Sequence, residues 1–274
     1  MKHNKPTIGL FLLLFIIIVL LFLSGAHKAH AQDNFSVILS QQETTYAYRA
    51  EEKRNRADNV ELAASRINGA ILQPEEIFSY NGLVGARTEK NGFKEAPEII
   101  RGDLVDGIGG GVCQVSGTTH AAMLYAGMTI IESTQHSRHS VYIDPGLDST
   151  VSWPRLDLKM QNNYPFPVKI VAETYRDKKK GHLIVRVLGK KQMFRTEVVS
   201  EIHKKEKYKT KKIFRRDLKK GYRKMIEPGT YKIKMTRTRR IYRIDNGSLI
   251  LEETLNLHYN DSDRVFIIGL GPKE

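Results

Sequence analysis

The chain contains one cysteine, Cys113, which follows a run of glycines and precedes a run of apolar residues. Glycines stand at positions 107, 109, 110 and 111, and residues 121–127 (AAMLYAG) have the composition of a helix that ends at Gly127. Cys113 is therefore expected close to the N-terminus of a helix. The positive end of a helix dipole and the free backbone N–H groups there favour the thiolate, which is the nucleophilic form of cysteine.

A nucleophilic cysteine also needs a base, a group that orients the base, and hydrogen-bond donors for the oxyanion. His136 is predicted to be the base and then the acid, and Asp148 is predicted to orient it. Glycines let backbone N–H groups approach a substrate carbonyl closely, so the N–H groups of residues 110–113 are expected to bind the oxyanion. The predicted substrate loop comprises Gly109, Gly110, Gly111, Val112 and Ser116.

Other readings of these residues stay open. His120, further along the predicted helix, and His139, three residues after His136, are alternative bases. On a strand, a spacing of three points His136 and His139 to opposite faces, so no metal site is predicted, and no cofactor is implied. Cys113 as an inert buried thiol is the alternative to a reactive one, because free cysteine is often buried.

The first 31 residues have the three-part pattern of a secretory signal peptide. A basic start precedes an uncharged apolar run at residues 8–23 and an Ala-x-Ala cleavage pattern at residues 29–31. Retention as an uncleaved anchor is the alternative. Either way residues 32–274 are expected outside the cytoplasm, in the cell envelope, with the membrane contacted only through the N-terminal segment. Exported proteins usually pair their cysteines, so a single one suggests a reactive thiol or an intermolecular bond.

The formal net charge is +14. Residues 201–224 alone hold twelve Lys and Arg against three Asp and Glu. For an exported protein this charge favours anionic envelope polymers or lipid headgroups as partners, and export argues against nucleic acid. A merely solvated surface is the alternative.

The hydrophobic patterns predict an α+β fold, in which the cysteine-bearing helix packs on antiparallel sheet and a small extended β domain follows. A helix is expected at residues 58–69, capped by Asp58, after a polar stretch at residues 48–56 that is expected to be a linker or exposed. Trp153 is expected in the core or in a subsite wall. Hairpins are predicted at residues 167–188 and, around the turn at residues 245–247, at residues 230–259. The predicted units are residues 1–31 (signal or anchor), 32–193 and 194–274 (basic linker and β domain).

The stretch from about residue 56 to residue 188 resembles the VanW-like family. The matching residues are Asn81 in FSYN, GGGVCQVS at 109–116, His136 and Ser137, Tyr142, GLDSTV at 146–151, Asp157 and Leu158, and Asn162 and Asn163. Ser137 and Tyr142 are thereby further site candidates. Residues 195–274 are loosely similar to the wall-associated, glycine-marked β domain that often follows a VanW-like domain.

The resemblance implies an enzyme of the L,D-transpeptidase type, in which the cysteine forms a thioester with peptidoglycan stem peptides. It agrees with the reading of an exported chain that has one unpaired cysteine and a downstream histidine. Two alternatives remain: a cysteine peptidase or amidase that cleaves peptidoglycan, and a non-catalytic protein for envelope binding or assembly.

Overall fold

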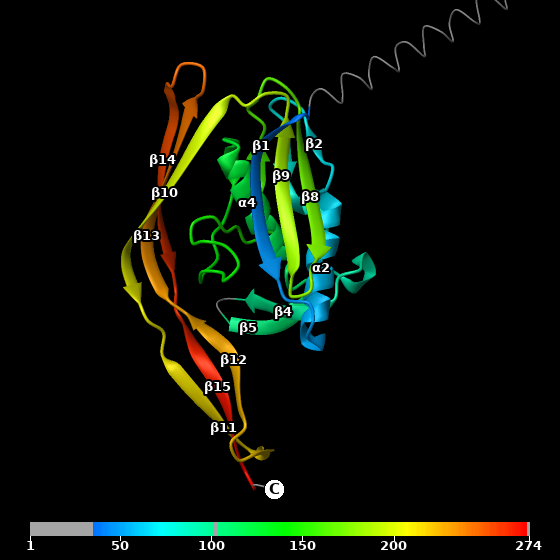
Figure 1. Ribbon diagram of the computed structural model, residues 1–274, viewed down its shortest axis with the longest axis vertical. Coiled ribbons are helices and arrows are strands. Elements are labelled where there is room, and N and C mark those ends of the chain that lie inside the picture. Colours follow the sequence, from blue (N-terminus) through cyan, green and yellow to red (C-terminus); the bar gives the residue numbers. More distant parts are fainter. Residues whose placement is uncertain (1–34, 101–102, 273–274) are drawn as a thin grey trace, which may run out of the picture.

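The computed structural model describes residues 35–100 and 103–272 (Figure 1). The predicted signal segment, residues 1–31, lies outside these residues. The described chain is mostly β, with several antiparallel sheets and few helices, so the α+β class holds in this coarser form. In Figure 1 a body of helices and sheets stands beside a long arm of strands from the C-terminal part of the chain.

The body is built around helix α4 (Val112–Tyr125), which lies between two sheets. The first sheet has the order β1-β9-β8-β2, formed by β1 (Val37–Tyr46), β9 (Gly181–Gly189), β8 (Val168–Arg176) and β2 (Ile71–Leu72). The second has the order β3-β7-β6, formed by β3 (Ile77–Ser79), β7 (Lys159–Gln161) and β6 (Thr129–Glu132). The β8–β9 pair is the predicted hairpin, fully antiparallel.

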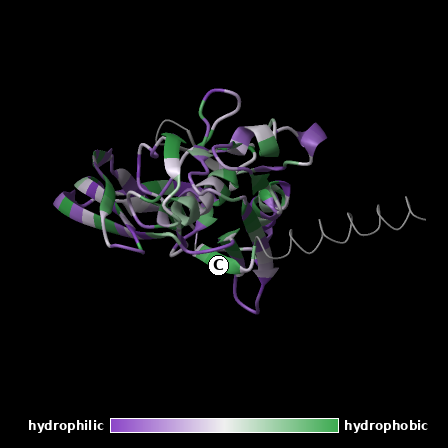
Figure 2. Cartoon of the chain, turned by 90° about the horizontal axis from the view of Figure 1, so that it is seen from above, coloured by the Kyte–Doolittle hydropathy of each residue, from purple (hydrophilic) through white to green (hydrophobic). Residues whose placement is uncertain are grey.

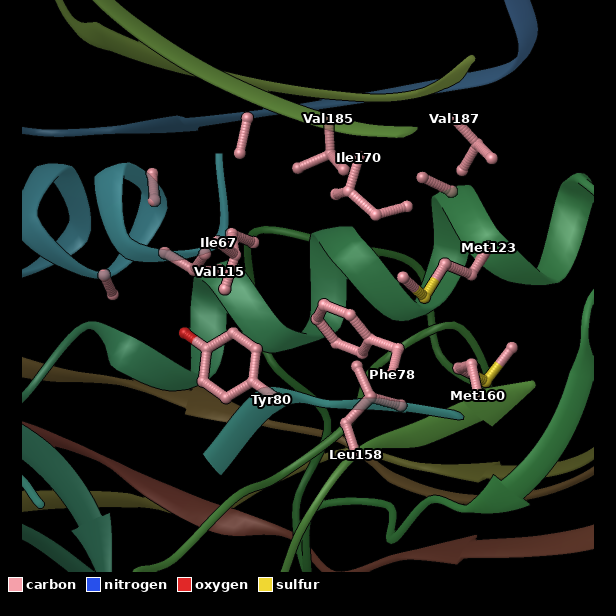
Figure 3. Packing of buried hydrophobic residues seen from close by; sticks show 14 of the residues in the cluster. Ile67, Phe78, Tyr80, Val115, Met123, Leu158, Met160, Ile170, Val185 and Val187 are labelled. Carbon is pink, nitrogen blue, oxygen red and sulfur yellow. The ribbon is translucent and has the colours of Figure 1, made fainter. Parts of the chain in front are cut away.

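Packing on both sides explains why nearly all of α4 is buried. Figure 3 shows Val115 and Met123 of α4 between Val185 and Val187 of the first sheet and Met160 of the second. A helix that is covered all round needs partners for its polar side chains. The hydroxyls of Thr118 and Thr119 donate back to helix carbonyls, and the Gln114 amide donates to the carbonyl of Thr45 in β1 at 3.0 Å. Partial exposure within α4 is confined to Cys113 and Tyr125.

Helix α2 (Glu51–Ile67) packs beside α4 on the same face of the first sheet. It begins seven residues before the predicted start, so a linker that reaches residue 56 is wrong, although several residues of this stretch are exposed as expected. Asp58 is therefore not the cap. Its carboxylate instead forms ion pairs with Lys94 at 2.7 Å and Arg176 at 3.0 Å. The missed turns carry few apolar residues, which is why periodicity did not reveal them.

Short elements connect α2 to α4. They are α3 (Tyr80–Val84), the 3-10 helix η1 (Glu89–Asn91), and the antiparallel pair β4 (Glu95–Ile100) and β5 (Asp103–Ile108). The glycine run leaves β5 and leads directly into α4.

Two three-stranded sheets make up the arm. One has the order β10-β13-β14, formed by β10 (Phe194–Glu206), β13 (Lys232–Arg243) and β14 (Leu249–Tyr259). The other has the order β11-β15-β12, formed by β11 (Thr210–Lys219), β15 (Ser262–Gly271) and β12 (Arg223–Thr230). Hydrophilic and hydrophobic residues are interspersed along these strands (Figure 2). The β13–β14 hairpin is as predicted, and the basic residues 201–224 lie mostly on exposed strands.

The arm is attached to the body by buried polar contacts as well as apolar ones. Phe194 and Ile241 belong to the main hydrophobic core. Arg239, which is 1% exposed, donates to the carbonyl of Met128 at 2.9 Å, and Arg237 donates to the carbonyl of Gly146 at 2.6 Å. Among the described residues, no helix is both long and apolar enough to cross a membrane.

Candidate functional site

A cleft of about 830 Å³ lies where the body meets the arm. Its walls come from the end of β1, the first turns of α2, the glycine run, the loop at residues 134–142 and the arm. The residues that matter for its chemistry are Lys53, Arg56, Cys113, His136, Thr150 and Glu227. Trp153 is not among the lining residues and is 47% exposed, so the expectation of a core or subsite role for it is wrong.

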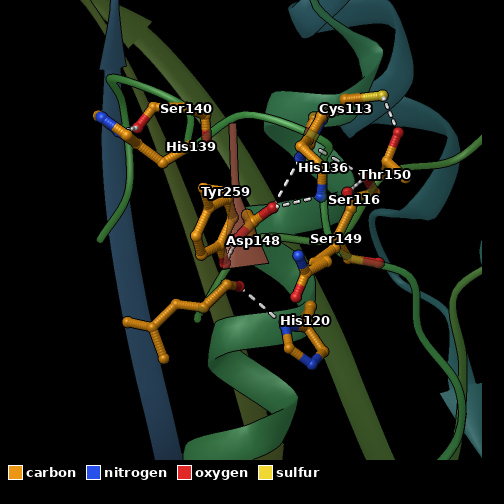
Figure 4. A network of polar contacts seen from close by, with 12 residues as sticks. Cys113, Ser116, His120, His136, His139, Ser140, Asp148, Ser149, Thr150 and Tyr259 are labelled. Carbon is orange, nitrogen blue, oxygen red and sulfur yellow. Dashed lines mark hydrogen bonds and ion pairs between the residues drawn. The ribbon is translucent and has the colours of Figure 1, made fainter. Parts of the chain in front are cut away.

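Cys113 is the second residue of α4 and is partly exposed on the cleft side. Its Sγ lies 3.7 Å from Oγ1 of Thr150 and 3.6 Å from the carbonyl oxygen of Val151. The thiol therefore sits in a polar niche at the positive end of the helix, at the edge of the main hydrophobic core. Figure 4 shows this niche beside His136.

The glycine run forms the cap of α4. Gly111 is the N-cap residue with φ 108°, a left-handed conformation that favours glycine. At Gly110 a Cβ would lie 2.4 Å from the carbonyl oxygen of Ala96, so the loop packs directly on β4. The N–H of Val112 donates to the carbonyl of Gly109. Within the described chain, the N–H groups of Gly110, Gly111 and Cys113 donate no backbone hydrogen bond, so the expected oxyanion donors narrow to these three.

His136 and Asp148 come together through loops, although they are separated in sequence. The imidazole Nδ1 of His136 donates to Oδ2 of Asp148 at 2.8 Å, and the His136 backbone N–H donates to the same oxygen at 2.8 Å. Both residues are buried, at 6% and 4% exposed. This double contact fixes the ring and leaves Nε2 for the thiol of Cys113.

The second oxygen of Asp148 is held by the arm. Tyr259, the last residue of β14, donates from its hydroxyl to Oδ1 of Asp148 at 2.6 Å. The same hydroxyl accepts from the N–H of Gly146 at 2.7 Å. Figure 4 shows Asp148 between Tyr259 on one side and His136 on the other. The carboxylate is thus satisfied on both oxygens without water.

The electrostatics favour a thiolate–imidazolium pair. Burial raises the pKa of the Cys113 thiol, but hydrogen bonding and charge from His136 outweigh it and lower the pKa below its ordinary value. Burial lowers the pKa of His136, whereas hydrogen bonds to Asp148 and Cys113 raise it to about 10. Burial raises the pKa of Asp148, and His136 and Tyr259 together lower it below its usual range. The shifts of all three groups favour their charged forms.

The two alternative histidines are placed differently. His120 is 1% exposed, its Nδ1 bonds the carbonyl of Leu147 at 2.8 Å, and burial lowers its pKa to about 4. It points away from Cys113 (Figure 4). His139 lines the same cleft as His136, because both stand in a loop and not on a strand; the opposite-face argument is therefore wrong. His139 packs edge-on against Tyr259 at 6.4 Å between ring centroids. No three His, Cys, Asp or Glu side chains of the described ranges converge as a metal site requires.

Some of the other predicted site residues line the cleft, and others are buried behind it. Ser137 and Tyr142 line the cleft. The Tyr142 hydroxyl donates to the carbonyl of Cys113 at 3.1 Å. Ser116 does not face the cleft; it is fully buried and donates to the carbonyl of Ser149 at 2.6 Å, which joins α4 to the loop that carries Asp148. Val112 is buried as well.

Sequence reasoning missed two residues of the site. Tyr259 carries no local signal, because it lies on another sheet far along the chain. Arg56 was assigned to a linker, yet it lines the cleft from α2. The signal for it was present: Arg56 stands four residues before Val60, on the apolar face of the helix, where a charged residue is unusual.

Comparisons with known proteins agree with the predicted resemblance. Residues 55–188 match the family described as VanW like protein. Over 122 residues the chain is 43% identical to "Uncharacterized protein YoaR" of Bacillus subtilis (strain 168), covering 44% of this chain and 40% of that protein. Over 143 residues it is 32% identical to "Vancomycin B-type resistance protein VanW" of Enterococcus faecalis (strain ATCC 700802 / V583), covering 46% of this chain and 51% of that protein. The chain thus spans about half, or less, of the length of these relatives.

Two solved structures resemble part of the chain. The "IgA1 Protease G5 domain structure" has a TM-score of 0.18 and 18% identity, and covers 30% of this chain and 90% of that one. The "Crystal structure of HP0197-G5" has a TM-score of 0.15 and 16% identity, and covers 28% of this chain and 97% of that one. Both of these solved structures are G5 domains.

Proposed function

Because residues 55–188 of this chain form a VanW-like domain, we propose that it is a cell-wall cysteine acyltransferase of the L,D-transpeptidase type. Its substrates are peptidoglycan stem peptides, which it joins through a thioester on Cys113. The observation that carries the proposal is the Cys113–His136–Asp148 arrangement at the wall of the cleft. A thiolate at a helix N-terminus, beside an imidazolium that a buried carboxylate orients, is the set of groups that acyl transfer needs.

In the first half-reaction, the Cys113 thiolate attacks the carbonyl carbon of the third stem residue. N–H groups among those of Gly110, Gly111 and Cys113 stabilise the oxyanion, a contribution of about 3–4 kcal/mol per donor in measured cases. The imidazolium of His136 gives its proton to the departing amine as the C–N bond breaks. The terminal D-amino acid leaves, and the acyl group remains on sulfur as a thioester.

In the second half-reaction, the amine of a neighbouring stem attacks the thioester carbonyl. His136, now neutral, takes the proton of that amine, and the C–S bond breaks to regenerate the thiolate. Asp148 keeps the imidazole in one orientation through both steps and balances its positive charge. The residues require no metal ion or cofactor for these steps.

The wider context supports a site of action at the wall. One relative is named as a vancomycin resistance protein. The N-terminal pattern favours export, and we propose residues 32–193 as the catalytic unit and residues 194–274 as an accessory β unit. The net charge of +14 suits a polyanionic envelope.

Two alternative functions remain. The first uses the same catalytic residues, and the second uses none of them for catalysis. With water as acceptor in place of the amine, the same thioester chemistry gives a peptidase or amidase. A non-catalytic envelope-binding protein is favoured by one observation, the single-layer sheet β11-β15-β12. It is basic on its first strand and exposes Ile213 and Phe214 there.

The deciding experiment is intact-protein mass spectrometry of the full chain after incubation with purified tetrapeptide muropeptides. The acyltransferase predicts a peptide-sized adduct on the parent protein, which Cys113→Ala lacks. The released products then separate cross-linked from hydrolysed stems. The Ser200→Ala variant, which changes an exposed serine of β10 that does not line the cleft, is the matched control and should still form the adduct. Absence of both adduct and product, with Cys113 slow to alkylate at neutral pH, would support the binding protein instead.

A further inference from the structure

The cleft beside Cys113 carries an excess of positive charge. Among the described residues, its lining includes the cations Lys53, Arg56 and Arg138 and one carboxylate, Glu227. Glu227 lies 3.7 Å from Arg138, so those two charges are matched. The imidazolium of His136 lies between two anions, the thiolate of Cys113 and the carboxylate of Asp148. These three groups carry one net negative charge, which is less than the charge of the two cations on α2. The excess positive charge of the cleft wall therefore comes from Lys53 and Arg56 on α2.

Arg56 stands directly against the start of the cysteine helix. A Cβ at Gly111 would lie 3.1 Å from Cγ of Arg56 and 2.9 Å from its carbonyl oxygen. Gly111 is two residues before Cys113, and Arg56 and Cys113 line the same cleft. Lys53 is three residues earlier on the same helix and lines the same cleft, as the i, i+3 spacing requires.

The guanidinium of Arg56 has no acceptor in the part of the chain that the structure describes: no ion pair and no side-chain hydrogen bond involves it. The contrast with other arginines is clear, because Arg176, Arg186 and Arg239 each hold a carboxylate. Burial also lowers the pKa of Arg56, with the tyrosine Tyr142 and Cys113 among the groups around it. A partly buried guanidinium without an acceptor costs free energy unless a ligand supplies one.

We infer that Arg56, with Lys53 beside it, forms an anion subsite next to Cys113 that holds a carboxylate of the peptide whose carbonyl the thiol attacks. The identity of the ligand as a wall peptide rests on the proposed function. The subsite itself rests on the geometry of Arg56. A planar guanidinium suits a carboxylate, which it binds through two parallel N–H donors. The subsite would place the scissile carbonyl of a free-acid peptide at Sγ and would select it over its amide.

The test compares two small electrophiles that alkylate the same thiolate. Iodoacetate carries a carboxylate and iodoacetamide does not; in both reactions an S–C bond forms and iodide leaves. The ratio of their second-order rate constants on Cys113 cancels any change in the pKa of the thiol. In the full chain, Arg56→Gln should lower the iodoacetate-to-iodoacetamide ratio roughly tenfold, as expected for losing one charge a few ångströms away in a partly dehydrated cleft.

The matched control is Arg54→Gln, an exposed arginine on the same helix that does not line the cleft. Arg54→Gln should leave the iodoacetate-to-iodoacetamide ratio unchanged. Arg56→Lys should give a ratio between those of the parent protein and Arg56→Gln. An equal ratio in Arg56→Gln and Arg54→Gln would overturn the subsite.

A second measurement needs no variant and covers the case in which Arg56→Gln does not fold. N-acetyl-D-alanine should slow iodoacetamide labelling of the parent protein more than N-acetyl-D-alaninamide does, and equal protection by the two would count against the subsite. Neither measurement depends on turnover. If muropeptides form no adduct while the ratio still depends on Arg56, the proposed function fails and the subsite stands.

Discussion

The hydroxyl of Tyr259 donates a hydrogen bond of 2.6 Å to Oδ1 of Asp148, across 111 residues of sequence. Tyr259 is fully buried and belongs to β14 of the arm, whereas Asp148 belongs to the body. The arm therefore contributes a side chain to the network that orients His136. The arm is therefore part of the candidate site as well as a separate β structure.

Replacing Tyr259 by Phe is expected to lower the free energy of unfolding by about 1.5–3 kcal/mol at neutral pH, the range for a lost hydrogen bond to a charged group. The sign of the pH effect follows from Asp148. A carboxylate whose folded pKa is depressed stabilises the fold above its ordinary pKa of 3.8, and this stability is lost as the pH falls through the folded value. The difference between parent and variant should therefore shrink on acidification, as measured by urea unfolding at several pH values.

The control for this variant is Tyr231→Phe, whose ring packs in the same small cluster as Tyr259. That change should alter stability by less than half as much, with no dependence on the pH. If Tyr259→Phe lowers the free energy of unfolding by the same amount at pH 7 and in acid, the hydroxyl of Tyr259 does not act through Asp148.

Cys113 should alkylate quickly at neutral pH because His136 lowers the pKa of the thiol. In His136→Gln the hydrogen bond and the charge are gone, so burial dominates and the pKa rises. We expect the rate of iodoacetamide labelling at pH 7 to fall by at least about tenfold, and the midpoint of its pH profile to move to higher pH. His139→Gln, a change at the other cleft histidine, should leave both unchanged. If His136→Gln does not shift the pH profile of labelling, the Cys113–His136 ion pair has no part in the mechanism.

The same histidine predicts how stability depends on alkaline pH. The pKa of His136 is raised from 6.5 to about 10. A raised pKa stabilises the fold fully below 6.5, and this contribution is lost as the pH rises toward 10. Each unit of difference is worth about 1.4 kcal/mol, so the loss amounts to a few kcal/mol. The gap in unfolding free energy between the parent and His136→Gln should narrow steadily across this window. A gap that is constant from pH 6 to 10 would contradict the raised pKa.

Local patterns in the sequence were enough to predict much of this site. The glycine run and the apolar residues after it mark the position of α4, because glycine at a left-handed cap and a buried helix each leave a short-range signature. The β8–β9 and β13–β14 hairpins could be predicted for the same reason. His136 and Asp148 could be proposed from residue type and order alone.

What the sequence did not reveal depends on distant contacts. Tyr259 is an ordinary tyrosine on an alternating strand until the arm folds back onto the body. Arg56 was missed because the first turns of α2 are polar and have no side-chain cap at Ala50. His120, which the sequence offers as an alternative base, also depends on distant contacts: its ring is bonded to the carbonyl of Leu147, and burial lowers its pKa to about 4.

Asn59 provides the last prediction, because it joins three parts of the site. This fully buried residue of α2 donates from Nδ2 to the carbonyls of Lys94 at 2.8 Å and Gly110 at 3.0 Å, and accepts from the N–H of Lys94 at 2.8 Å. Asn59→Leu would leave these groups without partners, at about 1–3 kcal/mol for each buried one. We expect a loss of at least about 3 kcal/mol in unfolding free energy and slower labelling of Cys113, because Gly110 sits in the loop that caps α4. The control Asn55→Leu lies one turn earlier on α2, is exposed and donates once to β4 at 2.9 Å, so it should cost less than about 1 kcal/mol and leave labelling unchanged. If the two variants unfold at the same urea concentration and label at the same rate, Asn59 does not hold the glycine loop in place for Cys113.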